Sequence, residues 1–471
     1  MIYVHIPFCR SFCTYCDFYS EVAAKCRKAE DAIKQESLFG AFAEALAKET
    51  VSRADEISDE VNTLYIGGGT PSVLPLSAFN SLLEALRSVG HSGQFDEFTV
   101  EVNPEDVVEK GPGYIEGLMK LGVNRISMGV QSFDNEILRF MNRRHDADTA
   151  VSAYAILEQA GVKNISIDLI FGLPQLSSQR WRETVDKALH ISSQGNLPGH
   201  ISSYQLSVEP GSMLAKLVER GQWSEAEDGL CHEQYSILCE MLSTAGYHHY
   251  EISNFALPGY EAKHNSAYWR HVPYVGLGPG AHSMLIIPQS PSATAPEGIG
   301  ALSDFPCLSG QTPVPVAASG EALRNIPQSP SATAPEGIGA LSDFPCLSGQ
   351  TPVPVAASGE ALRIIPQSPS ATAFKRMWNR EDLTAYIQDP MSVQDGEDLT
   401  AEQVVLEKIM LGLRTSDGVA ENYLRANCDV AELAKALREG NLEPVTVAGH
   451  CNLRIPENRF FVSDAIISAL V

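Results

Sequence analysis

The chain has 471 residues, of which 44% are hydrophobic, and its 58 acidic against 34 basic residues give a formal net charge of −24. This charge argues against general nucleic-acid binding, in which lysine and arginine neutralise phosphates. No apolar run is long enough to cross a bilayer and the first residues lack a signal-peptide pattern, so we expect a cytoplasmic protein without an integral membrane segment.

Three cysteines, Cys9, Cys13 and Cys16, follow the first predicted strand (residues 2–6) with the spacing C-x3-C-x2-C. In a reducing compartment such a cluster more often binds metal or performs chemistry than forms disulfides. A tetrahedral zinc site would need a fourth, distant ligand, whereas an iron–sulfur cube held by three thiolates would leave one iron free to bind a small molecule. The spacing alone does not decide between these metals.

Short β-rich runs alternate with helical patterns up to about residue 250. After the strand at 2–6, further strands are predicted at 62–66, 98–102, 125–130, 166–172 and 200–208, with a helix at 38–54. This alternation predicts parallel strands with crossover helices, in either a doubly wound sheet or a barrel. Polar or glycine-rich residues follow each strand, and in both architectures the carboxyl ends of the strands carry the site.

Residues 287–373 consist of a tandem repeat with a period of 39 residues. The two full copies, which begin at Ile287 and Ile326, differ only at their last position, Asn325 against Ile364. The segment is rich in proline, serine, alanine and glycine and contains no lysine. A composition of this kind cannot bury enough apolar surface to offset the cost of ordering, so we expect a flexible insertion without a chemical role.

A compact tail resumes after the repeats. An amphipathic helix is predicted from Thr400, a candidate N-cap with Gln403 three residues later, and a second helix is predicted near 430–440. The tail indicates a small helical or winged-helix-like domain. Because few basic residues cluster in it, a packing or lid role is favoured over DNA binding.

The ordered motifs of the chain resemble those of radical S-adenosylmethionine (SAM) enzymes, in particular the coproporphyrinogen oxidase-like branch with HemN and HemW. The resemblance rests on the cysteine spacing, GGGTPS at 67–72, VEVNPED at 100–106, RISMGVQSF at 125–133 and IDLIFGLP at 167–174. It continues through HISSYQLSVEPG, YEISNFA, HNSAYW and GLGPGAHS, resumes at RMWN (376–379), and covers everything except the repeats.

The resemblance implies an α/β fold, a partial (βα)6 barrel of the TIM type with a small C-terminal domain. We therefore expect a radical SAM domain at 1–285, the insertion at 286–374 and a HemN-type domain at 375–471. It also implies that Cys9, Cys13 and Cys16 hold a [4Fe–4S] cluster whose fourth iron is chelated by SAM. One electron, from a donor such as flavodoxin or ferredoxin, would then cleave SAM to a 5′-deoxyadenosyl radical.

Residues at family positions are expected to bind SAM. The glycine run would let the backbone approach the SAM amino group, Arg143 suits its carboxylate, and Glu101 and Asp168 suit hydroxyl or amine donors. The predicted SAM-binding residues are Tyr3, Tyr15, Gly68, Gly69, Thr70, Glu101, Gln131, Arg143 and Asp168.

Two departures distinguish this chain from the oxidase branch, which decarboxylates coproporphyrinogen III in porphyrin biosynthesis. Phe18 stands where that branch has a fourth cysteine, and the first cysteine comes at residue 9, without room for the oxidase's N-terminal extension. Both favour HemW, a heme-binding relative that acts as a heme chaperone and transfers heme to acceptor proteins. Coproporphyrinogen oxidation is the alternative.

The motif HNSAYW at 264–269 supports the heme interpretation, because it matches the HNxxYW motif associated with heme binding in this branch. His264 could supply an imidazole to the iron, and Tyr268 and Trp269 could stack against the macrocycle. On general grounds, a lone histidine beside aromatic residues is more often a hydrogen-bonded structural residue.

Overall fold

The structure is a computed structural model that describes residues 1–22, 29–57, 62–287 and 373–471. The predicted flexible insertion, apart from its ends, lies outside the described residues. Within them, none of the helices is both long enough and apolar enough to span a membrane.

Six parallel strands form the centre of a nine-stranded sheet, and all six had been predicted from the sequence. In spatial order they are β1 (Ile2–Ile6), β4 (Thr63–Gly68), β5 (Glu97–Val102), β6 (Arg125–Gln131), β7 (Asn164–Phe171) and β8 (His200–Gln205). The short parallel strand β11 (Val275–Leu277) extends the edge beside β1. At the other edge, β10 (Asn254–Ala256) pairs antiparallel with β8, and β9 (His248–Glu251) pairs antiparallel with β10.

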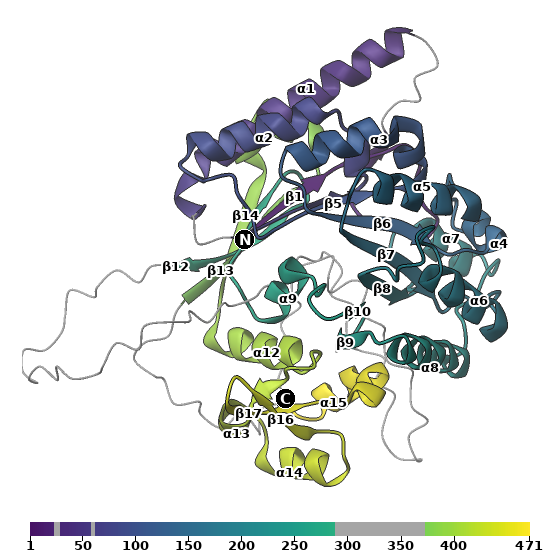
Figure 1. Ribbon diagram of the computed structural model, residues 1–471. Coiled ribbons are helices and arrows are strands. Elements are labelled where there is room, and N and C mark those ends of the chain that lie inside the picture. Colours follow the sequence, from purple (N-terminus) through teal and green to yellow (C-terminus); the bar gives the residue numbers. More distant parts are fainter. Residues whose placement is uncertain (23–28, 58–61, 288–372) are drawn as a thin grey trace, which may run out of the picture.

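Crossover helices cover the outer face of this curved sheet (Figure 1). They are α1 (Ala29–Ser52), α2 (Leu76–Ser88), α3 (Pro104–Lys120), α5 (Ala147–Gln159), α6 (Ser178–Leu189) and α8 (Asp228–Thr244). The helix predicted at 38–54 corresponds to the later part of α1, which begins nine residues earlier and ends two residues sooner, at Ser52. Side-chain caps begin two of these helices: Asp146 accepts from the Thr149 amide in α5, and Ser177 accepts from the Arg180 amide in α6.

The two faces of the parallel strands differ in chemistry. Successive strand residues point to opposite faces. One set of alternating positions is apolar and buried in the hydrophobic core, as in Val4, Ile66, Val100, Met128 and Ile167. The other set is polar and lines an interior pocket; it comprises Tyr3, Tyr65, Glu101, Arg125, Ser127, Asp168, Ser202 and Tyr204. TIM-type barrels usually fill the interior with branched apolar side chains, so this interior is suited to a polar ligand.

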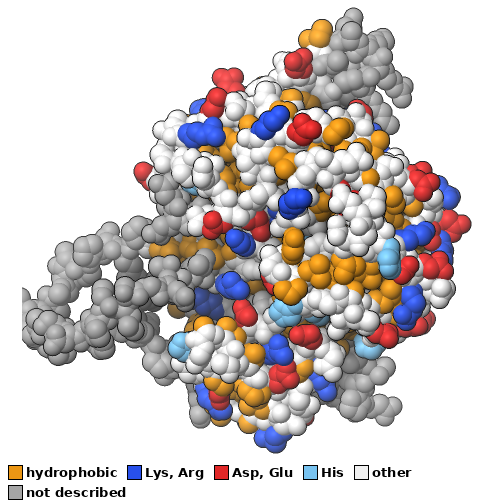
Figure 2. Space-filling view, in the orientation of Figure 1, with side chains coloured by type: hydrophobic (Ala, Val, Ile, Leu, Met, Phe, Trp, Pro, Cys, Tyr) orange, Lys and Arg blue, Asp and Glu red, His pale blue; other side chains and the backbone are white. Residues whose placement is uncertain are grey.

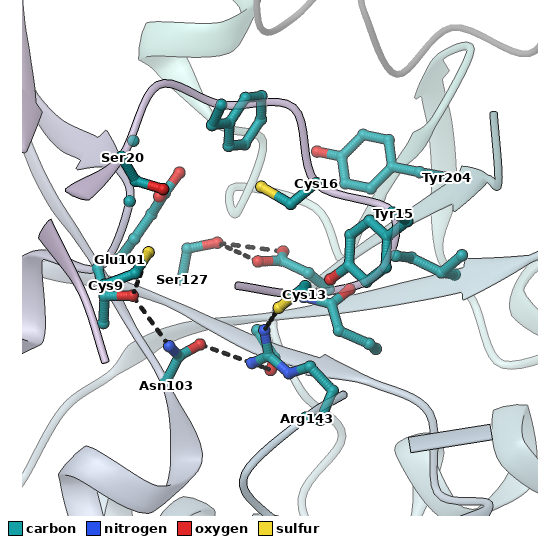
Figure 3. A pocket seen from close by; sticks show the side chains of 18 of the residues that line it. Cys9, Cys13, Tyr15, Cys16, Ser20, Glu101, Asn103, Ser127, Arg143 and Tyr204 are labelled. Carbon is teal, nitrogen blue, oxygen red and sulfur yellow. Dashed lines mark hydrogen bonds between the residues drawn. The ribbon is translucent and has the colours of Figure 1, made fainter. Parts of the chain in front are cut away.

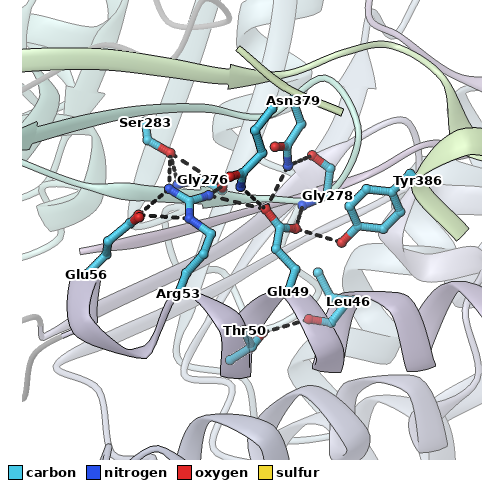
Figure 4. Close-up of polar contacts among 11 residues, drawn as sticks. Leu46, Glu49, Thr50, Arg53, Glu56, Gly276, Gly278, Ser283, Asn379 and Tyr386 are labelled. Carbon is cyan, nitrogen blue, oxygen red and sulfur yellow. Dashed lines mark hydrogen bonds and ion pairs between the residues drawn. The ribbon is translucent and has the colours of Figure 1, made fainter. Parts of the chain in front are cut away.

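A buried charged network ties α1 to the chain on both sides of residues 288–372 (Figure 4). The Glu49 carboxylate is fully buried and accepts from the Gly278 amide (2.9 Å), Asn379 Nδ2 (2.8 Å) and the Tyr386 hydroxyl (2.7 Å). Arg53 donates to the same carboxylate at 3.2 Å. Strands β12 (His282–Ile287) and β13 (Ala373–Asn379) also pair antiparallel. The two ends that flank the repeats are therefore held beside each other.

The tail contains the predicted helices. Helix α12 (Ala401–Gly412) begins with the Thr400–Gln403 capping box, as the sequence predicted, and α14 (Val430–Arg438) is the second helix. They accompany α13 (Glu421–Asn427), α15 (Ser463–Ser468) and a small antiparallel sheet of β15 (Val419–Ala420), β17 (His450–Arg454) and β16 (Glu443–Val447). Acidic and basic side chains are interspersed over the face in Figure 2. The domain boundaries at 285 and 375 stay predictions.

Candidate functional site

A pocket at the carboxyl ends of the parallel strands gathers every residue predicted for the cluster and for SAM (Figure 3). These lining residues are Tyr3, Cys9, Cys13, Tyr15, Cys16, Gly68, Gly69, Thr70, Glu101, Gln131, Arg143 and Asp168. Of the three residues predicted for heme, Tyr268 lines the same pocket, whereas His264 and Trp269 do not.

The loop that carries the cysteines is held by hydrogen bonds to two distant segments. The Thr14 amide donates to Met141 O (3.1 Å), and the Leu214 amide donates to Thr14 O (2.8 Å). Asn142, in the left-handed region at φ 56°, donates from Nδ2 to Phe12 O at 2.7 Å. The loop is therefore shaped by the protein itself around the pocket.

The three thiols face one pocket but do not converge. Among the described residues, no three His, Cys, Asp or Glu side chains come close enough to hold a metal ion. Burial raises the pKa of Cys9 and raises that of Cys16 well above its usual range. Since thiolates are the form that binds metal, cluster loading would have to displace these protons and draw the sulfurs together. The donor set, three sulfurs in an enclosed pocket, fits an iron–sulfur cluster.

A chain of hydrogen bonds links two of the cysteines across the pocket floor (Figure 3). Cys9 Sγ lies 3.4 Å from Thr70 Oγ1, and Asn103 Nδ2 donates to that hydroxyl at 3.2 Å. Arg143 then donates from Nη2 to Asn103 Oδ1 (2.6 Å) and from Nη1 to Cys13 Sγ (3.4 Å). Asn103, which the sequence reasoning did not select, is the central member of this chain.

Arg143 has a further contact and one orphaned atom. Its Nη2 donates to Gly129 O at 2.7 Å, while its Nε is buried and has no hydrogen-bond partner among the residues that the structure describes. For the predicted role of Arg143, binding the SAM carboxylate, the Nε–H group is available in this arrangement. Its other contacts support the cysteine loop and the end of β6.

Two carboxylates, one on β5 and one on β7 with β6 between them, are held in fixed positions. Glu101 accepts from the Tyr65 hydroxyl at 2.6 Å, and Asp168 accepts from the Ser127 hydroxyl with both oxygens at 3.1 Å. Burial raises the pKa of Asp168, and the charge of Arg125 and bonds from serine hydroxyls partly offset the effect. These carboxylates are placed to accept from hydroxyl or amine groups of a ligand.

The glycine run after β4 has a structural cause within the chain. A Cβ on Gly68, whose φ is +100°, would lie 2.6 Å from the His5 ring, and one on Gly69 would lie 2.7 Å from Phe8 O. The Gly69 amide donates to Ile6 O at 2.8 Å. Glycine is thus needed for close packing of the end of β4 against β1 and the start of the cysteine loop, and the predicted approach to the SAM amino group stays a prediction.

His264 lies behind the pocket wall in α9 (Lys263–Trp269). Its side chain is fully buried, with Nδ1 3.0 Å from Thr63 Oγ1 and Nε2 3.0 Å from Tyr268 Oη. Burial is the main cause that lowers its pKa well below the usual range. In this arrangement both ring nitrogens are engaged, so ligation of iron by His264 would require Tyr268 or Thr63 to move. Trp269 is buried as well.

Comparison with known proteins agrees with the fold and the cysteine loop. The radical SAM superfamily profile matches residues 3–188. A protein from Lactococcus lactis named heme chaperone HemW is 37% identical over 60% of this chain and 69% of its own length. Proteins with the same name from Synechocystis and Escherichia coli are 35% and 33% identical, over 65% and 70% of their lengths. This chain thus spans about two thirds of these relatives.

The solved structure of coproporphyrinogen III oxidase (HemN) from Escherichia coli is similar in fold, with a TM-score of 0.63 over 99% of this chain and 89% of that chain. At 18% identity, this likeness concerns the fold alone. The chain belongs to the radical SAM superfamily and, within it, to the HemW family. The resemblance drawn from the sequence motifs is confirmed.

Proposed function

We propose that this chain is a heme chaperone of the HemW type, which holds a [4Fe–4S] cluster, SAM and heme and passes heme to acceptor proteins. The observation that carries the proposal is that one pocket collects Cys9, Cys13 and Cys16 together with Asn265 and Tyr268 of the HNSAYW motif. Relatives named for heme chaperone activity support it.

Cys9, Cys13 and Cys16 would hold the cluster, with Asn103, Thr70 and Arg143 keeping two of the sulfurs in place. Together, the bound cluster and SAM supply one-electron cleavage of a sulfonium carbon–sulfur bond. Glu101 and Asp168 would orient SAM by accepting hydrogen bonds, and the buried, orphaned Nε of Arg143 would donate to its carboxylate. Tyr3, Tyr15, Gly68, Gly69, Thr70 and Gln131 would complete this site.

Heme would enter on the side of the pocket formed by α9. Tyr268 presents an aromatic ring and a hydroxyl there, and Asn265 lies beside it on the pocket wall. His264 would act first as the residue that positions Tyr268, because its Nε2 lies 3.0 Å from that hydroxyl. Ligation of the iron by His264 and stacking by Trp269 remain proposals that need α9 to rearrange.

Phe18 supports the chaperone over the oxidase. It lines the pocket at the position where the oxidase branch has its fourth cysteine, and its side chain is apolar. Heme and heme-accepting proteins are the proposed partners, with an electron donor such as flavodoxin or ferredoxin and a cytoplasmic location. The radical SAM domain at 1–285, the insertion at 286–374 and the C-terminal domain at 375–471 complete the proposal.

The two functions are separated by one pair of assays on the anaerobically reconstituted full chain. We expect stoichiometric hemin binding and no turnover of coproporphyrinogen III in the presence of SAM and a reductant. Two successive decarboxylations at catalytic rates would replace the chaperone with the oxidase. Tyr268→Phe and His264→Ala should both weaken hemin binding, and unchanged stoichiometry and affinity in both variants would remove the HNSAYW motif from the heme site.

A further inference from the structure

Arg125 is a buried cation at the inner end of the pocket. It is the first residue of β6, its side chain is 1% exposed, and it lines the pocket. Its Nε is buried without a hydrogen-bond partner, and neither a hydrogen bond nor an ion pair joins the guanidinium to any other residue that the structure describes. Arg143 in the same pocket, by contrast, makes three hydrogen bonds.

The two carboxylates whose charges act on Arg125 are engaged by other groups. Glu97 accepts from the backbone amides of Lys263 (2.7 Å) and His264 (3.0 Å) at the start of α9. Asp168 accepts from the Ser127 hydroxyl with both oxygens. The charges of both carboxylates act on Arg125, but neither carboxylate contacts its guanidinium.

A buried guanidinium without a hydrogen-bond partner has lost its water and gained no hydrogen bonds in return, so only the charges of groups such as Glu97 and Asp168 act against the cost of its burial. Its donors form a rigid fork that matches the two oxygens of a carboxylate. An anionic group in the pocket would satisfy donors that the described protein leaves unused.

Arg125 lies on the side of the pocket where α9 begins, since Glu97, whose charge acts on Arg125, accepts from the first amides of α9. Its charge also acts on Asp168. Burial and the charge of Arg125 both lower the pKa of His200, and Arg125 also contributes to the lowered pKa of His264 after burial and the chain's amino group. On the other side, Arg143 is the arginine that donates to Cys13. The two arginines therefore serve different parts of the pocket.

We propose that Arg125 anchors a carboxylate of the pocket's tetrapyrrole ligand, an assignment that rests on the proposed heme function. A carboxylate could come from a side chain of the tetrapyrrole or from SAM, and the position of Arg125 on the α9 side favours the tetrapyrrole. The ligand would then be oriented with one acidic edge toward β6 and its ring toward Tyr268.

The test compares hemin with hemin dimethyl ester, in which both carboxylates are blocked, by titration of the full chain. Wild type should bind hemin about tenfold more tightly than the ester, the size expected for a hydrogen-bonded charged group. Arg125→Gln should reduce this preference to about twofold or less, and Arg125→Lys should give an intermediate value. The matched control Arg144→Gln removes a pocket-lining arginine that is paired with Glu105, and should keep the full preference.

Two results would overturn the assignment while leaving heme binding intact. Wild type could bind hemin and its dimethyl ester equally well, or Arg125→Gln could keep the full preference for hemin over the ester. Failure to bind either compound would overturn the proposed function itself. A loss of SAM affinity in Arg125→Gln with an unchanged acid preference would assign the arginine to the SAM carboxylate instead.

A stability measurement separates ligand binding from a structural role. Arg125→Met retains a long side chain and removes a guanidinium without hydrogen bonds, but it also removes the charge that partly offsets the burial of Asp168, so the ligand-free variant should melt within a few degrees of wild type. A large fall in the melting temperature would show that Arg125 supports the fold, and would contradict the anchor role.

Discussion

The two sides of the pocket handle buried polar groups differently. On the cysteine side, a continuous chain of contacts runs from Cys9 through Thr70, Asn103 and Arg143 to Cys13. On the α9 side, the Arg125 guanidinium has no hydrogen bond to any described residue, although Arg125 is more deeply buried than Arg143. The side chains that link Cys9 to Cys13 are therefore held by one another, and the Arg143 Nε is a donor left unused among the described residues, whereas on the α9 side the Arg125 guanidinium as a whole is left for a ligand to satisfy.

Removing any one of the three cysteines should have the largest effect on this arrangement. Cys9→Ala, Cys13→Ala and Cys16→Ala would each leave two thiolates, too few to hold a [4Fe–4S] cluster with one iron free. We expect iron and sulfide contents near zero after anaerobic reconstitution. Cys451→Ala, at an exposed thiol in β17, is the control and should load normally. A cluster retained at wild-type content in one of the three variants would exclude that cysteine as a ligand.

Breaking the hydrogen-bond chain at its centre should have the next largest effect. Asn103→Leu keeps the size of the side chain but removes its bonds to Thr70 and Arg143, so Cys9 and Cys13 lose part of their support. In the ligand-free protein we expect these two thiols to be alkylated severalfold faster, with Cys16 unchanged, and the cluster to load more slowly. Mass spectrometry of the labelled thiols measures this.

The matched control is Asn80→Leu, since Asn80 bonds only to its helix neighbour Glu84 among the contacts described. Alkylation rates of Cys9 and Cys13 equal to wild type in Asn103→Leu would show that the chain of bonds does not hold these thiols.

A smaller effect is expected from a buried acid at the edge of the barrel. Burial raises the pKa of Glu251 from 4.5 to about 8. Within the described part of the chain, Oε1 has no hydrogen-bond partner, and bonds from the Ser253 amide and Asn254 lower the pKa too little to offset burial. The folded state then holds the proton more tightly than the unfolded state. Its stabilising contribution is complete below about pH 4.5 and is lost as the pH rises through about 8.

Urea unfolding measures this. Between pH 5 and pH 8, the free energy of unfolding of wild type should fall by on the order of 1–3 kcal/mol more than that of Glu251→Gln, whose side chain cannot ionise. Glu84→Gln on the surface of α2 should follow wild type. An identical pH dependence in wild type and Glu251→Gln would mean that Glu251 ionises without cost in the folded state.

Much of the fold was readable from local patterns. The six strands carry apolar residues at alternating positions, the Thr400–Gln403 capping box marks the start of α12, and polar loops follow the strands that meet at one edge. The cysteine spacing and the ordered motifs identified the cluster and SAM residues that line the pocket. These features depend on neighbours in sequence or on the geometry of parallel strands.

The remaining features depend on contacts between distant segments. HNSAYW does not reveal which side of α9 faces the pocket, so the burial of His264 against Thr63, 201 residues away, was not predictable. Asn103 gains its role from Thr70 and Arg143, which lie on other loops. Arg125 did carry a signal that was missed, because a charged residue at an alternating position of a buried strand is rare without a partner.

The central claim is that three thiolates hold a cluster with one iron left for SAM. Electron paramagnetic resonance of the anaerobically reconstituted and reduced full chain, recorded with and without SAM, tests it most directly. The account predicts a [4Fe–4S] signal whose shape and position change when SAM is added. S-adenosylhomocysteine lacks the sulfonium charge, so the same change with this compound would show that the charge is not required for binding. A [4Fe–4S] signal that is identical with and without saturating SAM would contradict an open iron in this pocket.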